Sequence, residues 1–273
     1  MRIRIVDAFT DRPFAGNPAG VLLLDSDGFP DDTWLQNVAK EVNLSETAFA
    51  HPLPDGGAAD WALRWFTPAT EVDMCGHATL ATAHVLHTTG AASGTVRFRA
   101  RCGILTATAH DDATITLDFP TSPLTPLTVP DGIAKALGAE VLSAHDTGEH
   151  VGDLLVELAD ERTVRSLAPD FAALVAHSER GIIATAAAGD PSAGYDFVSR
   201  CFFPRVGIDE DPVTGSAHTA LAPFWSARLG RDELTGLQAS ARSGLVRTVL
   251  RGERTLLRGG AVTVVDGELL TAP

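Results

Sequence analysis

The chain has 273 residues, of which 45% are hydrophobic and 21% are charged, a balance typical of a globular protein with a substantial core. Its formal net charge of −14 argues against nucleic acid or an anionic membrane as a partner, whereas a small anionic ligand can still bind at a local positive site. The three cysteines, Cys75, Cys102 and Cys201, form no C-x-x-C pair, so neither a disulfide framework nor a zinc site is indicated.

The first residues alternate like a strand and lack the apolar segment of a signal peptide. No apolar run approaches the roughly 18 residues that a membrane helix needs. We therefore expect a cytoplasmic protein with no membrane partner.

Periodicity predicts strands joined by two helices in the first half of the chain. An amphipathic helix is expected from Trp34 to Val42, and a second helix over residues 76–87 is small and apolar nearly all round, so it should be buried. Residues 68–74 should form a turn. Strands are predicted at residues 2–6, 21–24, 44–50, 61–66, 95–101, 105–110 and 113–119.

Residues 120–130 contain four prolines and are the best linker candidate. Beyond them the first half recurs in four pairs of segments, in the same order and at a nearly constant offset. The pairs are Gly16-x-x-x-Gly20 with Gly148-x-x-x-Gly152, the run after Asp32 with that after Asp170, strand 61–66 with 195–202, and Gly76-His77-Ala78 with Gly215-Ser216-Ala217. Chance echoes are the alternative. If the repeat is real, each half surrounds one apolar helix, and a ligand cleft is expected between the halves.

The segment 207–218 reads G-I-D-E-D-P-V-T-G-S-A-H. Its three carboxylates, Asp209, Glu210 and Asp211, are predicted to lie in a turn. Asp211 is expected to point inward, because it lies nearest the Gly215-Ser216 pair that opens a helix and offers backbone N–H groups to an anion. A calcium loop is the weaker alternative, because the alternating ligands and the closing glutamate are missing.

Four further side chains could carry chemistry. Glu46 shares a strand face with apolar neighbours, which should raise the pKa of its carboxyl group and suit it to acid/base work; a solvent-exposed glutamate is the alternative. His77 begins the first buried helix and should be neutral there, or should simply cap that helix. Cys75 precedes Gly76 at the same helix start, where a thiol is activated. His218 is expected to pack or cap, and Cys102 and Cys201 to occupy core or neutral positions in strands.

Dinucleotide, Walker, zinc-protease and nucleophile-elbow motifs are absent from the sequence, so no cofactor and no metal is implied. Instead the chain resembles the PhzF family of phenazine biosynthesis-like isomerases, which have the diaminopimelate epimerase-like fold. The matching motifs are F-T-D-R-P-F-A-G-N-P-A-G (9–20), L-S-E-T-A-F (44–49), D-M-C-G-H-A-T-L-A (73–81), L-D-F-P (117–120) and the segment 207–218.

The resemblance implies an α+β fold of two pseudo-symmetric halves, each a β-barrel-like mixed sheet around a central helix. The halves are expected at residues 1–120, with roughly 260–273 returning to the first, and at 131–259, with the active site in the cleft between them. Glu46 matches the catalytic acid/base of the family, and His77, Asp211 and Ser216 match its other polar site residues. The expected substrate-binding residues are Gly76, Gly215, Cys75 and Asn17.

The resemblance further implies cofactor-independent proton transfer on a small, unsaturated or cyclic carboxylic acid, as in the isomerisation of dihydro-hydroxyanthranilate, and a homodimer. Epimerases of this fold carry a cysteine at both helix starts, whereas this chain has Cys75 and Thr214. That departure argues against two-thiol racemisation. Two alternatives stay open, a racemase, epimerase or double-bond isomerase that uses Cys75, and a non-catalytic binder of small molecules.

Overall fold

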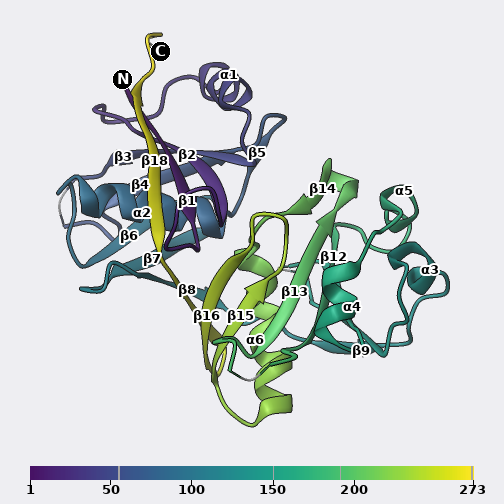
Figure 1. Cartoon of the computed structure of the whole chain (residues 1–273). Coiled ribbons are helices and arrows are strands. Elements are labelled where there is room, and N and C mark those ends of the chain that lie inside the picture. Colours follow the sequence, from purple (N-terminus) through teal and green to yellow (C-terminus); the bar gives the residue numbers. More distant parts are fainter. Residues whose placement is uncertain (55, 150, 191, 272) are drawn as a thin grey trace. The chain divides into compact units, whose positions relative to one another are not determined.

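The computed structural model describes residues 1–54, 56–149, 151–190, 192–271 and 273. The chain divides into two units (Figure 1), unit 1 formed by residues 1–118 and 258–273 and unit 2 by residues 119–257. Both units are mixed sheets with few helices, so the expected α+β class is confirmed.

Unit 1 is built around helix α2. Its helices are α1 (Asp32–Val42) and α2 (Gly76–Thr88). Its strands are β1 (Arg2–Ala8), β2 (Asn17–Leu23), β3 (Glu46–Pro52), β4 (Trp61–Phe66), β5 (Glu71–Val72), β6 (Thr95–Ala100), β7 (Gly103–Ala109) and β18 (Ala261–Glu268), and β8 (Ile115–Pro120) leaves the unit at its end. Since α2 is apolar all round, it is buried among β1, β2, β3, β7 and β18 (Figure 1).

Unit 2 is built in the same way around α6 (Gly215–Leu229). Its strands are β9 (Thr125–Leu127), β10 (Ser143–Asp146), β11 (Asp153–Glu157), β12 (Gly181–Ala187), β13 (Phe197–Phe203), β14 (Ile208–Asp211), β15 (Glu233–Gln238) and β16 (Gly244–Arg251), and β17 (Arg254–Gly259) leads out of it. Short helices α3 (Ile133–Leu137), α4 (Glu161–Ser166) and α5 (Phe171–Leu174) and a 3-10 turn η1 (Pro204–Val206) complete it.

The two units repeat one strand topology, which supports the internal repeat inferred from sequence. In unit 1, β2 pairs antiparallel with β1 and parallel with β3, β4 pairs antiparallel with β3 and β5, and β6 lies parallel to β4. In unit 2, β10 to β16 repeat this pattern strand for strand, with β13 in the place of β4. The helices α2 and α6 therefore begin at equivalent points of the repeat.

Each unit packs its helices onto its sheet through separate apolar clusters. In unit 1, α1 packs on β3 and β4, and its Leu35 and Val38 belong to one apolar cluster with Phe49. In unit 2, Trp225 of α6 stacks on Phe197 of β13, and Phe224 meets Trp225 edge to face within the same apolar cluster. The aromatic contacts hold α6 on its sheet, whereas α2 is held by its burial among the strands of unit 1.

Three predictions of local structure are wrong. Residues 120–130 are not a free linker, because β9 forms there and pairs with β10. Residues 208–211 form strand β14 rather than a turn, paired with β13. Cys102, expected at a core or neutral position in a strand, instead lies in the tight turn between β6 and β7 and is exposed, which excludes the core position.

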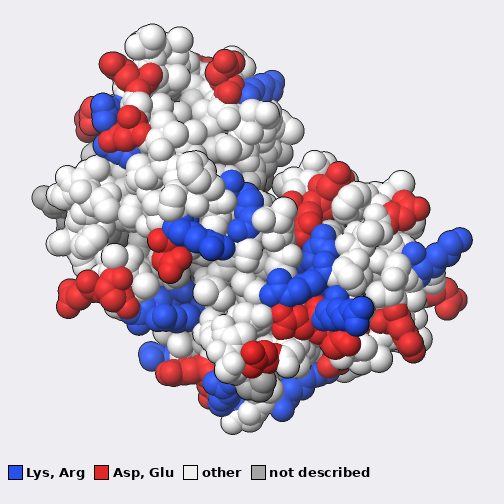
Figure 2. All heavy atoms as spheres, in the orientation of Figure 1, with Lys and Arg blue, Asp and Glu red and all other residues white. Residues whose placement is uncertain are grey.

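Acidic and basic side chains are interspersed over the face drawn in Figure 2. Among the described residues, no helix combines the length and the apolar composition needed to cross a bilayer.

Candidate functional site

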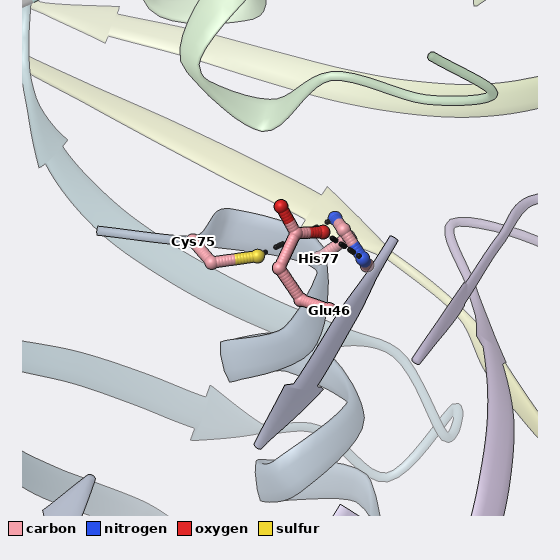
Figure 3. Close-up of side chains that lie close together, drawn as sticks. All are labelled: Glu46, Cys75 and His77. Carbon is pink, nitrogen blue, oxygen red and sulfur yellow. Dashed lines mark hydrogen bonds and ion pairs between the residues drawn. The ribbon is translucent and has the colours of Figure 1, made fainter. Parts of the chain in front are cut away.

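The start of α2 brings three predicted residues of unit 1 together (Figure 3). Glu46 is the first residue of β3, where it pairs with Ala19 of the neighbouring strand. Cys75 is the extended residue that precedes α2, and His77 lies in the first helical turn. Glu46, Cys75 and His77, which the sequence proposed one by one as candidates, therefore lie together at one helix start of unit 1.

The His77 ring lies between the other two side chains. Its Nδ1 is 3.5 Å from Sγ of Cys75, and its Nε2 is 3.3 Å from Oε2 of Glu46. The latter contact has the distance of an ion pair but not the alignment of a linear hydrogen bond, which is common for catalytic groups in the absence of substrate. The Glu46 side chain keeps 14% of its surface exposed, whereas His77 keeps 6%.

Burial decides the charge of His77. Desolvation lowers the pKa of its imidazole to about 3, because the charged form has lost the surrounding water. A neutral imidazole has one N–H donor and one acceptor nitrogen, so one of its two contacts is made by a donor and the other by an acceptor. The ring is thus a hydrogen-bonding group at neutral pH and not a cation.

The same three side chains are a possible metal set, since one ligand atom from each lies within 4.8 Å of the others. The two ring nitrogens, however, face different neighbours, Nδ1 the thiol and Nε2 the carboxylate. A metal ion takes only one nitrogen of an imidazole, so a single ion could not use both of the contacts that this ring makes. The arrangement suits proton handling better than a closed three-ligand site.

Asn17 supports the strand that carries Glu46. It is fully buried at the start of β2, and its Oδ1 accepts a hydrogen bond of 3.1 Å from Ser45, the residue before Glu46. Gly16 is required beside it, because its φ is +66° and a Cβ there would lie 2.1 Å from the carbonyl oxygen of Ala8. The geometry gives Asn17 a structural contact, whereas the sequence predicted substrate binding.

The equivalent helix start in unit 2 carries a different polar group. Asp211 ends β14 and is buried, as predicted, and its Oδ2 accepts a hydrogen bond of 2.5 Å from Oγ1 of Thr214. Gln238, fully buried at the end of β15, accepts from the backbone N–H of Thr214 at 2.8 Å and donates to the carbonyl oxygen of Asp211 at 2.7 Å. Gln238 thereby locks the residue before α6 to the end of β14.

Ser216, in the first turn of α6, accepts a hydrogen bond from an arginine that also forms an ion pair, an arrangement that the sequence did not suggest. Arg180 donates from Nη2 to Oγ of Ser216 at 3.2 Å and from Nη1 to Oδ2 of Asp153 at 2.6 Å. The Asp153 side chain is fully buried, whereas that of Arg180 is 39% exposed. Burial raises the pKa of Asp153 to about 6 although Arg180 opposes the shift.

The other two acids of the segment 207–218 point elsewhere. Asp209 is exposed. Glu210 binds Arg200 with both oxygens, at 2.7 and 2.8 Å, and Arg200 also donates to the carbonyl oxygen of Leu167. Glu210 is therefore a structural partner of β13, and Asp211 is the acid of the three that lies at the helix start.

The remaining candidates have structural surroundings. His218 is fully buried in α6, its Nδ1 lies 2.8 Å from the carbonyl oxygen of Thr214, and burial lowers the pKa of its ring to about 4. It packs inside its helix, as expected. Cys201 is buried in β13, and its burial raises the pKa of its thiol.

Sequence reasoning missed Gln238, Arg180 and Asp153. An aspartate at the head of the apolar run Asp153-Leu-Leu-Val is a signal that could have been used, because a charge that begins a buried strand needs a partner. Gln238 and Arg180 carry no local signal, since strand pairing alone brings them to the start of α6.

Known proteins share both the sequence and the fold of this chain. The family model described as phenazine biosynthesis-like protein, PhzC-PhzF, matches residues 6–267. A protein of Halalkalibacterium halodurans named an uncharacterized isomerase is 46% identical over 271 residues, which are 98% of each chain. The crystal structure of a PhzF-family phenazine biosynthesis protein from Enterococcus faecalis has a TM-score of 0.90 and 40% identity, with 99% of both chains covered. A predicted epimerase from Pseudomonas aeruginosa, 18% identical with a TM-score of 0.74 over 99% of both chains, has the same fold.

Proposed function

The chain belongs to the phenazine biosynthesis-like family, PhzC-PhzF, and from that premise we propose that it is a cofactor-independent isomerase that moves a proton on a small carboxylic acid. The family and the enzyme class confirm the resemblance seen in the motifs. We assign the acid/base role to Glu46. The observation that carries this assignment is the Glu46 carboxylate, largely buried, 3.3 Å from the neutral ring of His77 at the start of the central helix.

The chemistry needs a base that is partly removed from water and donors that stabilise the charge it creates. The Glu46 carboxylate accepts a proton from a carbon of the substrate, and the electron pair moves into the conjugated system toward an oxygen. The backbone N–H groups of Gly76 and His77, at the positive end of α2, stabilise that oxygen. The Glu46 carboxyl group then returns the proton to a different carbon, so substrate and product are isomers.

We assign Asp211, Gly215 and Ser216 to the binding of the polar groups of the substrate. Helix α6 presents the N–H groups of its first turn, which have no partner within the helix. The Ser216 hydroxyl is oriented by the hydrogen bond that its oxygen accepts from Arg180. Substrate class is thereby proposed as a small, unsaturated or cyclic acid. Homodimer assembly and a cytoplasmic location stay predictions.

A thiol-dependent racemase or epimerase is the second candidate, because Cys75 occupies a helix start beside an imidazole. Its equivalent in unit 2 is Thr214, whose hydroxyl is bonded to Asp211. A threonine cannot supply the second thiolate of a two-thiol reaction. Only a reaction with one thiol is compatible with these residues.

Solvent exchange tests the assignment. The protein is incubated in D₂O with a panel of small unsaturated and cyclic carboxylic acids, and deuterium in carbon positions is measured by NMR and mass spectrometry. We expect exchange in the wild type, a loss of at least roughly 100-fold in Glu46→Gln, and exchange that is retained in Cys75→Ala with a loss of no more than about tenfold. Glu41→Gln, an exposed glutamate in α1, is the matched control.

The reverse pattern, with exchange lost in Cys75→Ala and kept in Glu46→Gln, would transfer the chemistry to the thiol. Acids that bind tightly without exchanging in the wild type would identify a non-catalytic binder.

A further inference from the structure

The contact between Cys75 and His77 has no place in the proton transfer described above. The thiol is buried, with 7% of the residue exposed, and its Sγ lies 3.5 Å from Nδ1 of the ring. On the other side of the ring, Nε2 lies 3.3 Å from the Glu46 carboxylate (Figure 3). A neutral imidazole carries its single proton on one of these nitrogens, and the neighbours of the ring determine which one.

The two neighbours favour the same tautomer. A lone pair at Nε2 would face the negative oxygen of Glu46 and be repelled, whereas an N–H there is attracted. With the proton on Nε2, the Nδ1 lone pair is an acceptor, and the Cys75 S–H is a donor at the distance of a sulfur hydrogen bond. Each group then has a complementary role, S–H to Nδ1 and Nε2–H to carboxylate.

We propose that Cys75 is a positioning residue whose thiol donates to Nδ1 of His77 and so holds the ring as the Nε2–H tautomer, with that N–H on the side of the ring where Oε2 of Glu46 lies at 3.3 Å. The catalytic consequence of this arrangement rests on the proposed function, whereas the tautomer itself does not. An N–H group beside a carboxylate favours its charged form, which is the form that can accept a proton.

A nucleophilic thiolate would need a different state of the same ring. Helix starts favour thiolates, and reactive cysteines are paired with an imidazolium that has taken their proton. Here the burial of His77 opposes the imidazolium form. The imidazolium partner that such a thiolate needs is therefore disfavoured at this ring.

The ring tautomer can be measured without any substrate. Protein labelled with ¹⁵N-histidine is studied by two-dimensional NMR that correlates the ring protons with both ring nitrogens, and the spectrum of His77→Gln identifies the signals of His77. In the wild type we expect Nε2 to show the chemical shift of a protonated nitrogen and Nδ1 that of an unprotonated one. In Cys75→Ala we expect both nitrogens to shift toward intermediate values as the second tautomer becomes populated.

Two variants serve as controls for this measurement. Cys75→Ser keeps a donor at the same position and should preserve the wild-type tautomer, and Cys102→Ala removes an exposed thiol of the same unit and should change nothing. A proton on Nδ1 in the wild type, or the same tautomer population in Cys75→Ala as in the wild type, would overturn the proposal. Thermal unfolding of each variant shows whether it is folded.

The exchange assay separates positioning from chemistry. For an acid that exchanges, Cys75→Ala should lower kcat roughly tenfold, which is about 1.4 kcal/mol, with KM unchanged, and Cys75→Ser should recover most of the rate. A loss as complete as that of Glu46→Gln, or a substrate covalently trapped on Sγ, would show that Cys75 reacts directly and refute its positioning role. If the expected tautomers are observed while no acid exchanges, the proposed function fails and the tautomer assignment stands.

Discussion

Gln238 offers the most direct test of how the start of α6 is held. It is fully buried, and its amide makes three hydrogen bonds, to the backbone N–H and to Oγ1 of Thr214 and to the carbonyl oxygen of Asp211, at 2.8, 3.1 and 2.7 Å. Replacement by alanine removes all three bonds. The Thr214 N–H and the Asp211 carbonyl group then stay buried without these partners.

The magnitude follows from those two groups. A buried donor or acceptor that loses its partner costs about 1 to 3 kcal/mol. With two such groups affected, we expect Gln238→Ala to lower the free energy of unfolding by about 3 to 4 kcal/mol, a large part of the stability of an ordinary domain. Gln36→Ala is the matched control, because the Gln36 amide on α1 makes a single hydrogen bond, to the carbonyl oxygen of Thr67. It should cost about 1 kcal/mol or less.

Native-state hydrogen exchange measured by mass spectrometry is the suitable assay, because it reports on each unit separately. Peptides from α6 and β14 should lose protection in Gln238→Ala, while peptides from α2 in unit 1 should keep it. Urea unfolding provides the total change. Unchanged protection of α6, or equal losses in the Gln238 and Gln36 variants, would refute the reasoning that this amide fixes the helix start.

Two further predictions concern pH. The folded pKa of His77, about 3, is below its unfolded value of about 6.5, so its contribution to stability is present above pH 6.5 and is lost as the pH falls. The loss should reach about 2 kcal/mol at pH 5. The difference in unfolding free energy between wild type and His77→Gln should change by that amount, and a constant difference would contradict the prediction. Asp153 acts in the opposite sense, because its folded pKa of about 6 is above the unfolded value of about 3.9. Its contribution to stability is present at low pH and is lost as the pH rises through 6, by about 1.4 kcal/mol between pH 5 and 8. Asp153→Asn should abolish this pH dependence of the unfolding free energy in urea titrations.

Periodicity located the elements whose patterns are long and locally encoded. Helix α2 was predicted at residues 76–87 and occupies 76–88, because a run of small and apolar side chains can only be buried on all sides. Strand β3 was placed two residues early, since Leu44 and Ser45 extend the same pattern before Glu46. Cys75 and His77 could be placed at a helix start because α2 is well encoded, whereas for Glu46 the pattern left a solvent-exposed glutamate open and the family resemblance implied its role.

The start of α6 was less accessible to sequence reasoning. Strand β14 has four residues and pairs with β13 across an irregular register, so its acids looked like a turn. Arg180 lies 36 residues from Ser216, and Gln238 lies 24 residues from Thr214. Such contacts depend on strand pairing over long separations, which local periodicity does not contain.

The pairing of β1 with β18 has a consequence for the order in which the chain is assembled. Unit 1 needs residues 261–268 to complete its sheet, and backbone hydrogen bonds join Met1 and Leu269 in both directions. On the ribosome, unit 2 is fully synthesised while the edge of β1 still awaits its partner. Because these residues are adjacent, a short peptide could join residues 1 and 270. A circularly permuted gene that is opened within unit 2 would then encode unit 1 as one continuous stretch.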